Sequence, residues 1–228
     1  MPAPVTRPAA RVAGVLLARA LAPVAAVRRG RPLHPEGATL RGTLHLDEHL
    51  GGLAPADGFD GPALVRVSRS AGLPPGLPDV QGVAVRWHVD GAVRDLLLSG
   101  AGTGRVGRFV LRPRRSPWGG AFSTLMPFRT ARGPVLLAAV PGPSAAGDTR
   151  SGDLEVDLVL LAAAPRGPWR RCGRLVATER DDDADPRFDP VLHAPYGTYG
   201  WAAALRLPAY AAARRHGRTR SETVRRGS

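Results

Sequence analysis

Short strand-like segments separated by turn residues constrain the fold of this chain more than any other feature of its sequence. Between residues 39 and 178, runs of apolar residues are bounded by glycine, proline and aspartate, a pattern typical of β-strands joined by turns. The pattern predicts strands over Thr39–Leu46, Ala63–Ser70, Val80–Val89, Ala92–Ser99, Arg108–Arg112, Pro134–Val140, Leu154–Ala164 and Trp169–Thr178. About eight short strands, with no helix between most of them, favour an antiparallel sheet that closes into a barrel and so leaves no exposed edge.

The connections between these segments agree with an antiparallel arrangement. Asp90-Gly91 is a hairpin signal, because both residues tolerate the left-handed backbone conformation of a two-residue turn. Gly72–Pro78 is rich in glycine and proline and predicts irregular chain. Asp181–Asp185 lacks the alternating, glycine-containing pattern of a calcium loop and predicts a solvated acidic turn.

Both ends of the chain carry helix patterns. Arg11–Arg29 has apolar residues at near-helical spacing with a break at Pro23, and Trp201–His216 is rich in alanine and interrupted by Pro208. The predicted fold class is therefore α+β, an antiparallel barrel with N-terminal and C-terminal helices. Its predicted parts are a helical segment (residues 1–30), the barrel (residues 31–180), and a loop, helix and basic tail that complete the same domain (residues 181–228).

Chain length and net charge limit the kinds of function that this protein can have. A chain of 228 residues suits one domain with a real core. The formal net charge of +13 would suggest a nucleic-acid partner, but the arginines are scattered and only 5% of residues are aromatic. We therefore do not expect nucleic-acid binding, and the positive charge suits an anionic small molecule equally well.

The expected compartment is the cytoplasm, without a membrane partner. The single cysteine, Cys172, excludes an intrachain disulfide and fits a reducing environment. No apolar run of about 18 residues predicts a membrane span. The apolar stretch Val12–Val27 contains Arg19 and is followed by arginines where a cleaved signal would have small residues.

Three stretches combine histidine, arginine, serine and tyrosine at notable spacings. Arg31 stands three residues before His34, within Arg-Pro-Leu-His-Pro-Glu-Gly, and Val65–Ser68 reads Val-Arg-Val-Ser. Asp79, Gly82, Ala84, Arg86 and Asp95 follow, and Arg206 precedes Tyr210 by four residues. In this order the stretches resemble the haem-dependent catalase-like superfamily, in particular its short members, the catalase-related peroxidases.

The resemblance implies a haem site and a role for each matching residue. His34 would be the distal acid and base, Ser68 would orient its ring, and Arg31 and Arg66 would bind the haem propionates. Tyr210 would be the iron ligand, and therefore the metal-binding residue. Arg206 shares a helical face with Tyr210, because the two are four residues apart. Its charge would lower the pKa of the phenol and favour the phenolate that binds ferric iron.

The sequence differs from the family pattern at two positions, and these differences change the activity that we expect. The chain contains no asparagine, although the hydrogen-peroxide dismutases of the family place one beside the distal histidine. The aromatic residue that stacks on the porphyrin is also unassigned, with Phe109 the best candidate. We therefore expect a haem-dependent peroxidase, or an enzyme that processes organic hydroperoxides, that is a poor hydrogen-peroxide dismutase.

Other interpretations stay open at this point. Arg66 and Arg86 fit an ordinary role on the exterior of a barrel equally well. The main functional alternative is a haem-free catalase-like barrel that binds a small molecule or acts as an interaction module. His45, Asp47 and His49 share a strand face by period-two spacing and could hold a metal, although a solvated strand end is the simpler interpretation.

Overall fold

The computed structural model describes residues 36–47, 58–70, 72–73, 76–149, 153–184, 186–190 and 192–202. The chain divides into two compact units, residues 34–197 and residues 1–33 with 198–228, and the first unit contains the long strands. The predicted terminal helices lie outside the described residues, except that residues 200–202 are helical. The α+β class and the predicted domain bounds therefore remain predictions. Within the described residues, no helix is long and apolar enough to cross a membrane.

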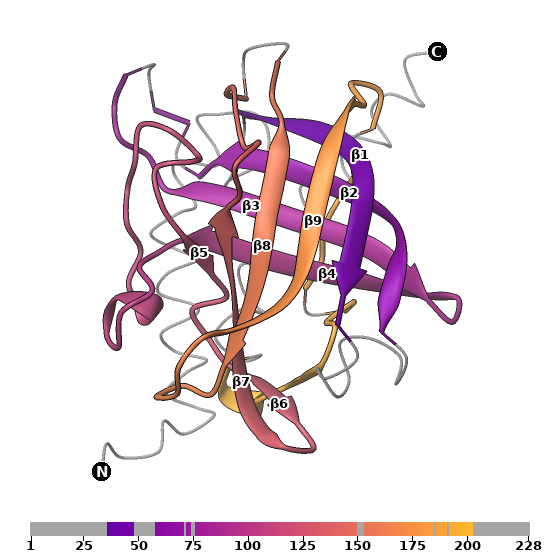
Figure 1. Cartoon of the computed structure of the whole chain (residues 1–228), viewed down its shortest axis with the longest axis vertical. Coiled ribbons are helices and arrows are strands. Elements are labelled where there is room, and N and C mark those ends of the chain that lie inside the picture. The colour runs from indigo at the N-terminus through magenta and orange to yellow at the C-terminus, as the bar shows by residue number, and fades with distance from the viewer. Residues whose placement is uncertain are drawn as a thin grey trace, which may run out of the picture. The chain divides into compact units, whose positions relative to one another are not determined.

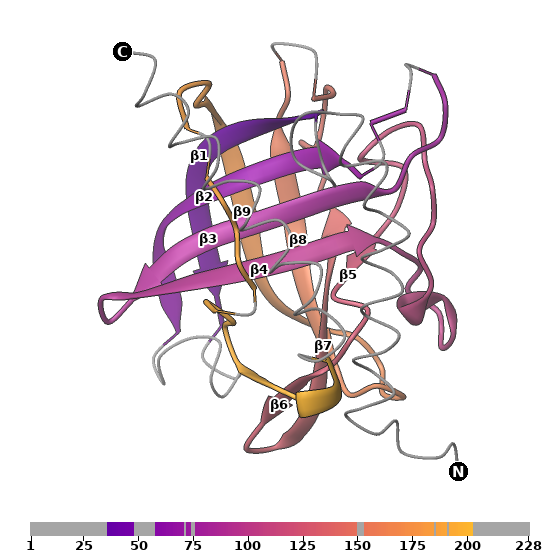
Figure 2. The same cartoon turned by 180° about the vertical axis from the view of Figure 1, so that it is seen from behind.

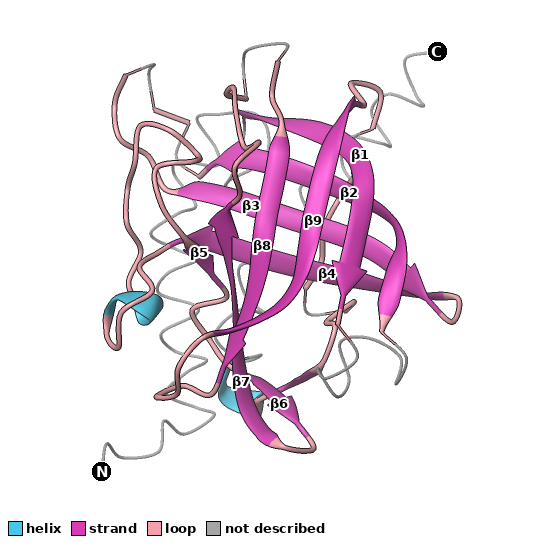
Figure 3. Cartoon of the chain, in the orientation of Figure 1, coloured by secondary structure: helices cyan, strands magenta, loops and turns pink. Residues whose placement is uncertain are grey.

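Antiparallel strands make up nearly all the regular structure of the described residues between 34 and 197, as Figure 3 shows. The strands are β1 (Glu36–Leu46), β2 (Phe59–Arg69), β3 (Gln81–Val89), β4 (Ala92–Gly100), β5 (Phe122–Ser123), β6 (Phe128–Thr130), β7 (Gly133–Pro141), β8 (Val156–Ala163), β9 (Arg170–Arg180) and β10 (Gly197–Thr198). A single 3-10 turn, η1 (Gly107–Phe109), lies between β4 and β5 within the described residues.

The sheet closes on itself, because β7 pairs with both β5 and β8. The ring runs β7-β5-β4-β3-β2-β1-β9-β8 and back to β7, so eight antiparallel strands form the barrel. In Figure 1, β8 and β9 cross in front of β2, β3 and β4, and Figure 2 shows the same two walls from behind. The predicted antiparallel barrel of about eight strands is confirmed.

Alternation along each strand separates the barrel core from its outer face. Valine and leucine dominate the inward positions, where branched side chains pack well against a pleated sheet. Trp87 on β3 is the largest fully buried side chain, only 1% exposed. The inward residues of the two central strands are Ala63, Val65, Val67, Val83, Val85 and Trp87. The intervening residues, Arg66, Ser68 and Arg86 among them, consequently lie on the outer face.

The hairpin turn between β3 and β4 was predicted correctly, whereas one of the predicted strands does not form. Asp90 and Gly91 both have positive φ angles, 51° and 74°, as the tight hairpin between β3 and β4 requires. The strand predicted over Arg108–Arg112 is wrong, because this segment begins in η1 and continues as loop. The eighth strand of the barrel is instead β5, two residues long. A strand of two residues is too short to be predicted from a pattern of apolar residues.

Asp157 on the outer face of β8 ties the loop that precedes this strand to the barrel. Its carboxylate accepts two hydrogen bonds from the Arg174 guanidinium, at 2.9 and 3.0 Å, and one from the Ser144 amide at 3.1 Å. The side chain is 1% exposed. The hydrogen bonds from Arg174, helped by that of Ser144, outweigh desolvation and lower the pKa of Asp157.

A pH-dependent contribution to stability follows from the lowered pKa of Asp157. The contribution is fully present above the pKa of an unfolded aspartate, about 4, and is lost as pH falls through the lower folded value. We expect Asp157→Asn to lower the free energy of unfolding by about 1–3 kcal/mol at pH 7, with the difference from the wild type shrinking below pH ~4. Urea unfolding at both pH values measures this. The matched control is Asp182→Asn, in an exposed ion pair with Arg180, and an Asp157→Asn effect that stays constant down to pH ~3 would contradict the assignment.

Candidate functional site

The outer face of β2 carries two buried polar side chains, Arg66 and Ser68. They are 8% and 4% exposed, although they lie on the side of the strand opposite the core residues Val65 and Val67. Because they are two residues apart on one strand, their side chains leave the sheet in the same direction. The Ser68 hydroxyl donates a long hydrogen bond, 3.5 Å, to the carbonyl oxygen of Gly82 on β3.

Small residues surround Ser68 on this face. Gly37 of β1 pairs with Ser68, which pairs in turn with Gly82, and Gly82 pairs with Ser99. A Cβ atom on Gly37 would stand 2.9 Å from the Arg66 guanidinium carbon and 2.6 Å from the Val67 carbonyl oxygen, so only glycine fits there. The absence of side-chain bulk lets the Arg66 guanidinium lie against β1. The strand that supplies Gly37 begins two residues after His34 in the sequence.

The remaining residues of the predicted haem site cannot be located in the same way. Arg31, His34, Arg206 and Tyr210 all lie outside the described residues. The structure therefore brings together Arg66 and Ser68 of the predicted set. Phe109, the candidate for stacking on a porphyrin, lies in the exposed turn η1.

The predicted metal alternative involves an exposed strand end. His45 lies 3.3 Å from a carboxylate oxygen of Asp47 and 3.3 Å from one of Asp60, and all three side chains are exposed. His49 lies outside the described residues. Among the described residues, no group of three or more histidine, cysteine or acidic side chains could hold a metal ion.

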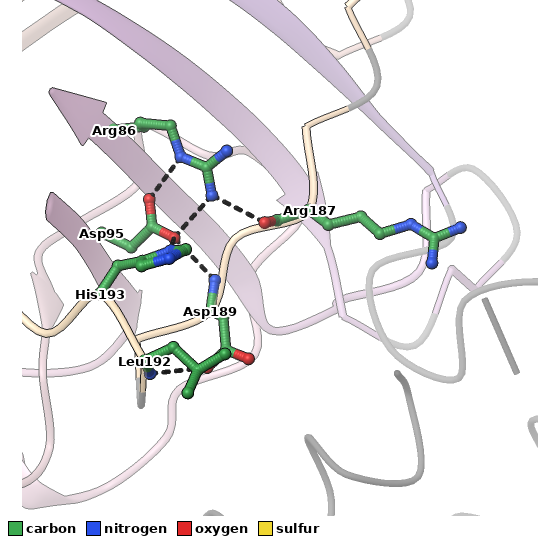
Figure 4. Close-up of polar contacts among 6 residues, drawn as sticks. All are labelled: Arg86, Asp95, Arg187, Asp189, Leu192 and His193. Carbon is green, nitrogen blue, oxygen red and sulfur yellow. Dashed lines mark hydrogen bonds and ion pairs between the residues drawn. The ribbon is translucent and has the colours of Figure 1, made fainter. Parts of the chain in front are cut away.

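Asp95 on β4 is the centre of a buried polar cluster, drawn in Figure 4. The carboxylate is 0% exposed and forms a bidentate pair with Arg86, with both nitrogen–oxygen distances 2.7 Å. Its Oδ2 also accepts a 2.7 Å hydrogen bond from the Asp189 amide and lies 3.2 Å from Nδ1 of His193. The hydrogen bonds from Arg86 to Asp95 raise the pKa of Arg86 and outweigh its desolvation.

This Asp95 cluster fastens a segment from late in the chain to the barrel wall. The Arg86 guanidinium donates to the Arg187 carbonyl oxygen at 2.7 Å and lies 5.2 Å from the centre of the Phe188 ring. The Asp95 amide donates to the His193 carbonyl oxygen at 2.7 Å. Because the polar groups of the cluster bind one another, its role is structural: it holds the late segment on the barrel wall. The sequence motifs included Arg86 and Asp95, but they gave no sign of Asp189 or His193.

A pocket of about 1030 Å³ opens at the end of the barrel where β1 ends and β2 begins. Its lining combines the apolar side chains of Phe59, Val135 and Ala162 with arginines 132, 170 and 171 and with aspartates 47 and 60. Within the described part of the chain, none of these three guanidinium groups has a hydrogen-bond or ion-pair partner. The three arginines outnumber the two aspartates of the lining, so the pocket combines apolar surface with a net positive charge.

Cys172 lines the same pocket but is unsuited to nucleophilic chemistry. Burial, together with the negative charge of Asp47, raises the pKa of its thiol to about 12. The thiol therefore stays neutral at physiological pH, whereas the thiolate is the reactive form. Cys172 serves the barrel as a small apolar core residue.

Comparison with known proteins adds no relative, since no family model and no curated protein matches the sequence.

Proposed function

We propose that this protein is a catalase-like, haem-dependent peroxidase or organic-hydroperoxide-processing enzyme. The observation that supports the proposal best is the pair of buried polar side chains, Arg66 and Ser68, on the outer face of a closed antiparallel barrel. Both belong to the Val-Arg-Val-Ser motif on which the family resemblance depends. The resemblance assigns Arg66 to a haem propionate, and a guanidinium forms strong bidentate hydrogen bonds with a carboxylate.

The residues fit the proposed cofactor where the structure describes them. The Arg66 guanidinium would bind a propionate, as would Arg31, and the row Gly37, Ser68, Gly82 and Ser99 offers a surface with little side-chain bulk for a planar ring. Tyr210 would supply an anionic oxygen to ferric iron, and Arg206 would keep that phenol ionised. Bound haem would provide the redox centre at which the O–O bond of a peroxide is cleaved.

His34 and Ser68 would handle protons and orientation. The imidazole of His34 would take a proton from one peroxide oxygen and deliver it to the other, as a general base and then a general acid. Ser68 would hold the ring of His34 by a hydrogen bond from its hydroxyl.

Substrate preference tests the proposed activity. The chain lacks an asparagine that would position hydrogen peroxide over the iron. We therefore expect the haem-loaded protein to evolve oxygen from hydrogen peroxide slowly, and to consume a bulky organic hydroperoxide faster. Oxygen-electrode and hydroperoxide-consumption assays on the same preparation measure the two rates. Oxygen evolution that outpaces organic-hydroperoxide turnover would refute this assignment.

The pocket at the barrel end favours a second candidate function, a haem-free barrel that binds a small molecule. The volume of about 1030 Å³, the apolar wall and the excess of three arginines over two aspartates would suit an amphipathic carboxylate. This pocket does not include Arg66 or Ser68 in its lining, so the two candidates use different parts of the barrel. Failure of the chain to take up haem would favour the second candidate.

A further inference from the structure

The turn that joins β4 to β5 concentrates exposed apolar side chains. Among the described residues, seven large hydrophobic side chains are exposed, and four of them lie within six consecutive positions: Val106, Phe109, Val110 and Leu111. Val106 is 74% exposed. Figure 3 shows this turn as a short helix that projects from the side of the barrel. Such a concentration of exposed apolar area marks an interaction surface.

A buried arginine holds this turn, residues 105–112, in a fixed shape. Arg108 is 4% exposed, and its guanidinium lies 4.6 Å from the centre of the Trp169 ring. The same guanidinium donates hydrogen bonds to five carbonyl oxygens, those of Thr103, Gly104, Ala164, Pro165 and Gly167. Arg108 therefore ties the turn to the β8–β9 connection while the neighbouring apolar side chains remain exposed.

The stretch of sequence that contains the 105–112 turn is cationic. Residues 96–147 contain seven arginines and no acidic residue. Arg105 and Arg112 flank the apolar side chains directly, and within the described residues neither has an ion-pair partner. The surface therefore presents apolar groups at its tip and unneutralised positive charge at its edges.

We propose that the 105–112 turn docks this protein on the surface of an anionic lipid bilayer. The apolar side chains enter the interfacial region, and Arg105 and Arg112 interact with anionic headgroups. An apolar tip flanked by arginines is complementary to a bilayer surface, where acyl chains lie beneath a layer of negative charge. The sequence expectation of no membrane partner rested on the lack of a spanning segment, and surface docking requires none.

Vesicle sedimentation with the full chain tests the docking. We expect binding to vesicles of phosphatidylcholine and phosphatidylserine at about 2:1, and little binding to pure phosphatidylcholine, with affinity falling as salt rises. Val106→Ser with Phe109→Ser should lower the affinity at least ~10-fold, because it removes the inserting side chains. Arg105→Gln with Arg112→Gln should lower it by a similar factor, about fivefold for each charge. The matched controls are Leu192→Ser, at an exposed apolar side chain outside the turn, and the pair Arg129→Gln and Arg132→Gln.

A fluorophore on the turn reports insertion directly. Val106→Cys can be labelled selectively, because Cys172 is buried and its thiol pKa is raised to about 12. We expect an environment-sensitive dye at position 106 to shift to shorter wavelength on anionic vesicles. The same dye at Thr43→Cys, an exposed position on β1, should not shift.

Three results would overturn the proposal. The first is no sedimentation with anionic vesicles. The second is sedimentation that survives both pairs of turn substitutions, which would assign binding to the general positive charge. The third is self-association of the chain, in the absence of vesicle binding, that Val106→Ser with Phe109→Ser abolishes. That outcome would make the turn a protein–protein contact.

Discussion

Replacing Asp95 with alanine should lower the free energy of unfolding by about 3–5 kcal/mol. The change removes the carboxylate from the Arg86 guanidinium, which keeps only its hydrogen bond to the Arg187 carbonyl oxygen, and from the Asp189 amide. Breaking a buried pair costs more than the pair contributed, because the surviving charge stays desolvated. Urea unfolding followed by circular dichroism measures the loss, and hydrogen exchange at the Asp189 amide should accelerate at the same time.

Two further variants show whether the loss of stability comes from the Asp95 cluster or from the removal of any carboxylate. Asp182→Ala removes a carboxylate from an exposed pair with Arg180 and should cost less than about 1 kcal/mol. The double variant Arg86→Met, Asp95→Leu should be less destabilised than Asp95→Ala alone, because it leaves no unpaired charge. A loss below about 1 kcal/mol for Asp95→Ala would show that the cluster does not fasten the segment that contains Asp189 and His193.

Replacing Tyr210 with phenylalanine should abolish haem binding or change the spectrum of the bound haem, while the fold survives. The substitution keeps the ring and removes the oxygen proposed to bind iron. If Tyr210 only packs, the change should cost on the order of 1 kcal/mol of stability and leave the spectrum unaltered. Arg206→Leu should weaken haem binding less, because it raises the pKa of the phenol without removing it.

Substitutions of the proposed distal residues should affect turnover and leave haem binding unchanged. His34→Ala should leave haem bound and abolish peroxide cleavage, since it removes the proton-transferring group. Ser68→Ala should reduce turnover without affecting haem content, because its proposed role is orientation. Equal haem loss in all these variants would indicate misfolding and would contradict the assigned roles.

Much of the barrel could be predicted, because its strands and one hairpin are determined by residues that are close together in the sequence. The Val-x-Val alternation of β2 and β3 identifies the strands and their inward faces, and Asp90-Gly91 identifies the hairpin from β3 to β4. A two-residue turn at positions 90 and 91 even sets the register, which places Arg86 opposite Asp95. The ion pair of these two residues could therefore have been predicted from the sequence.

Other features depend on residues distant in sequence and could not be predicted. Arg-Phe-Val-Leu-Arg over residues 108–112 has the composition of a strand, yet the Arg108 guanidinium binds carbonyl groups more than 50 residues away and fixes a turn. Asp189 and His193 reach Asp95 across more than 90 residues, with no local pattern to announce the contact. The outward burial of Arg66 likewise follows from tertiary structure, because strand alternation alone predicts an exposed arginine.

Titration of the apo protein with ferric haem tests the proposed function most directly. The wild-type chain should bind one haem, with a high-spin ferric spectrum typical of a tyrosinate ligand. Tyr199→Phe, a change at another of the three tyrosines, should behave like the wild type, whereas Tyr210→Phe should bind no haem or give a different spectrum. No saturable haem binding by the wild type, or identical titrations of the wild type and Tyr210→Phe, would contradict the haem-dependent account.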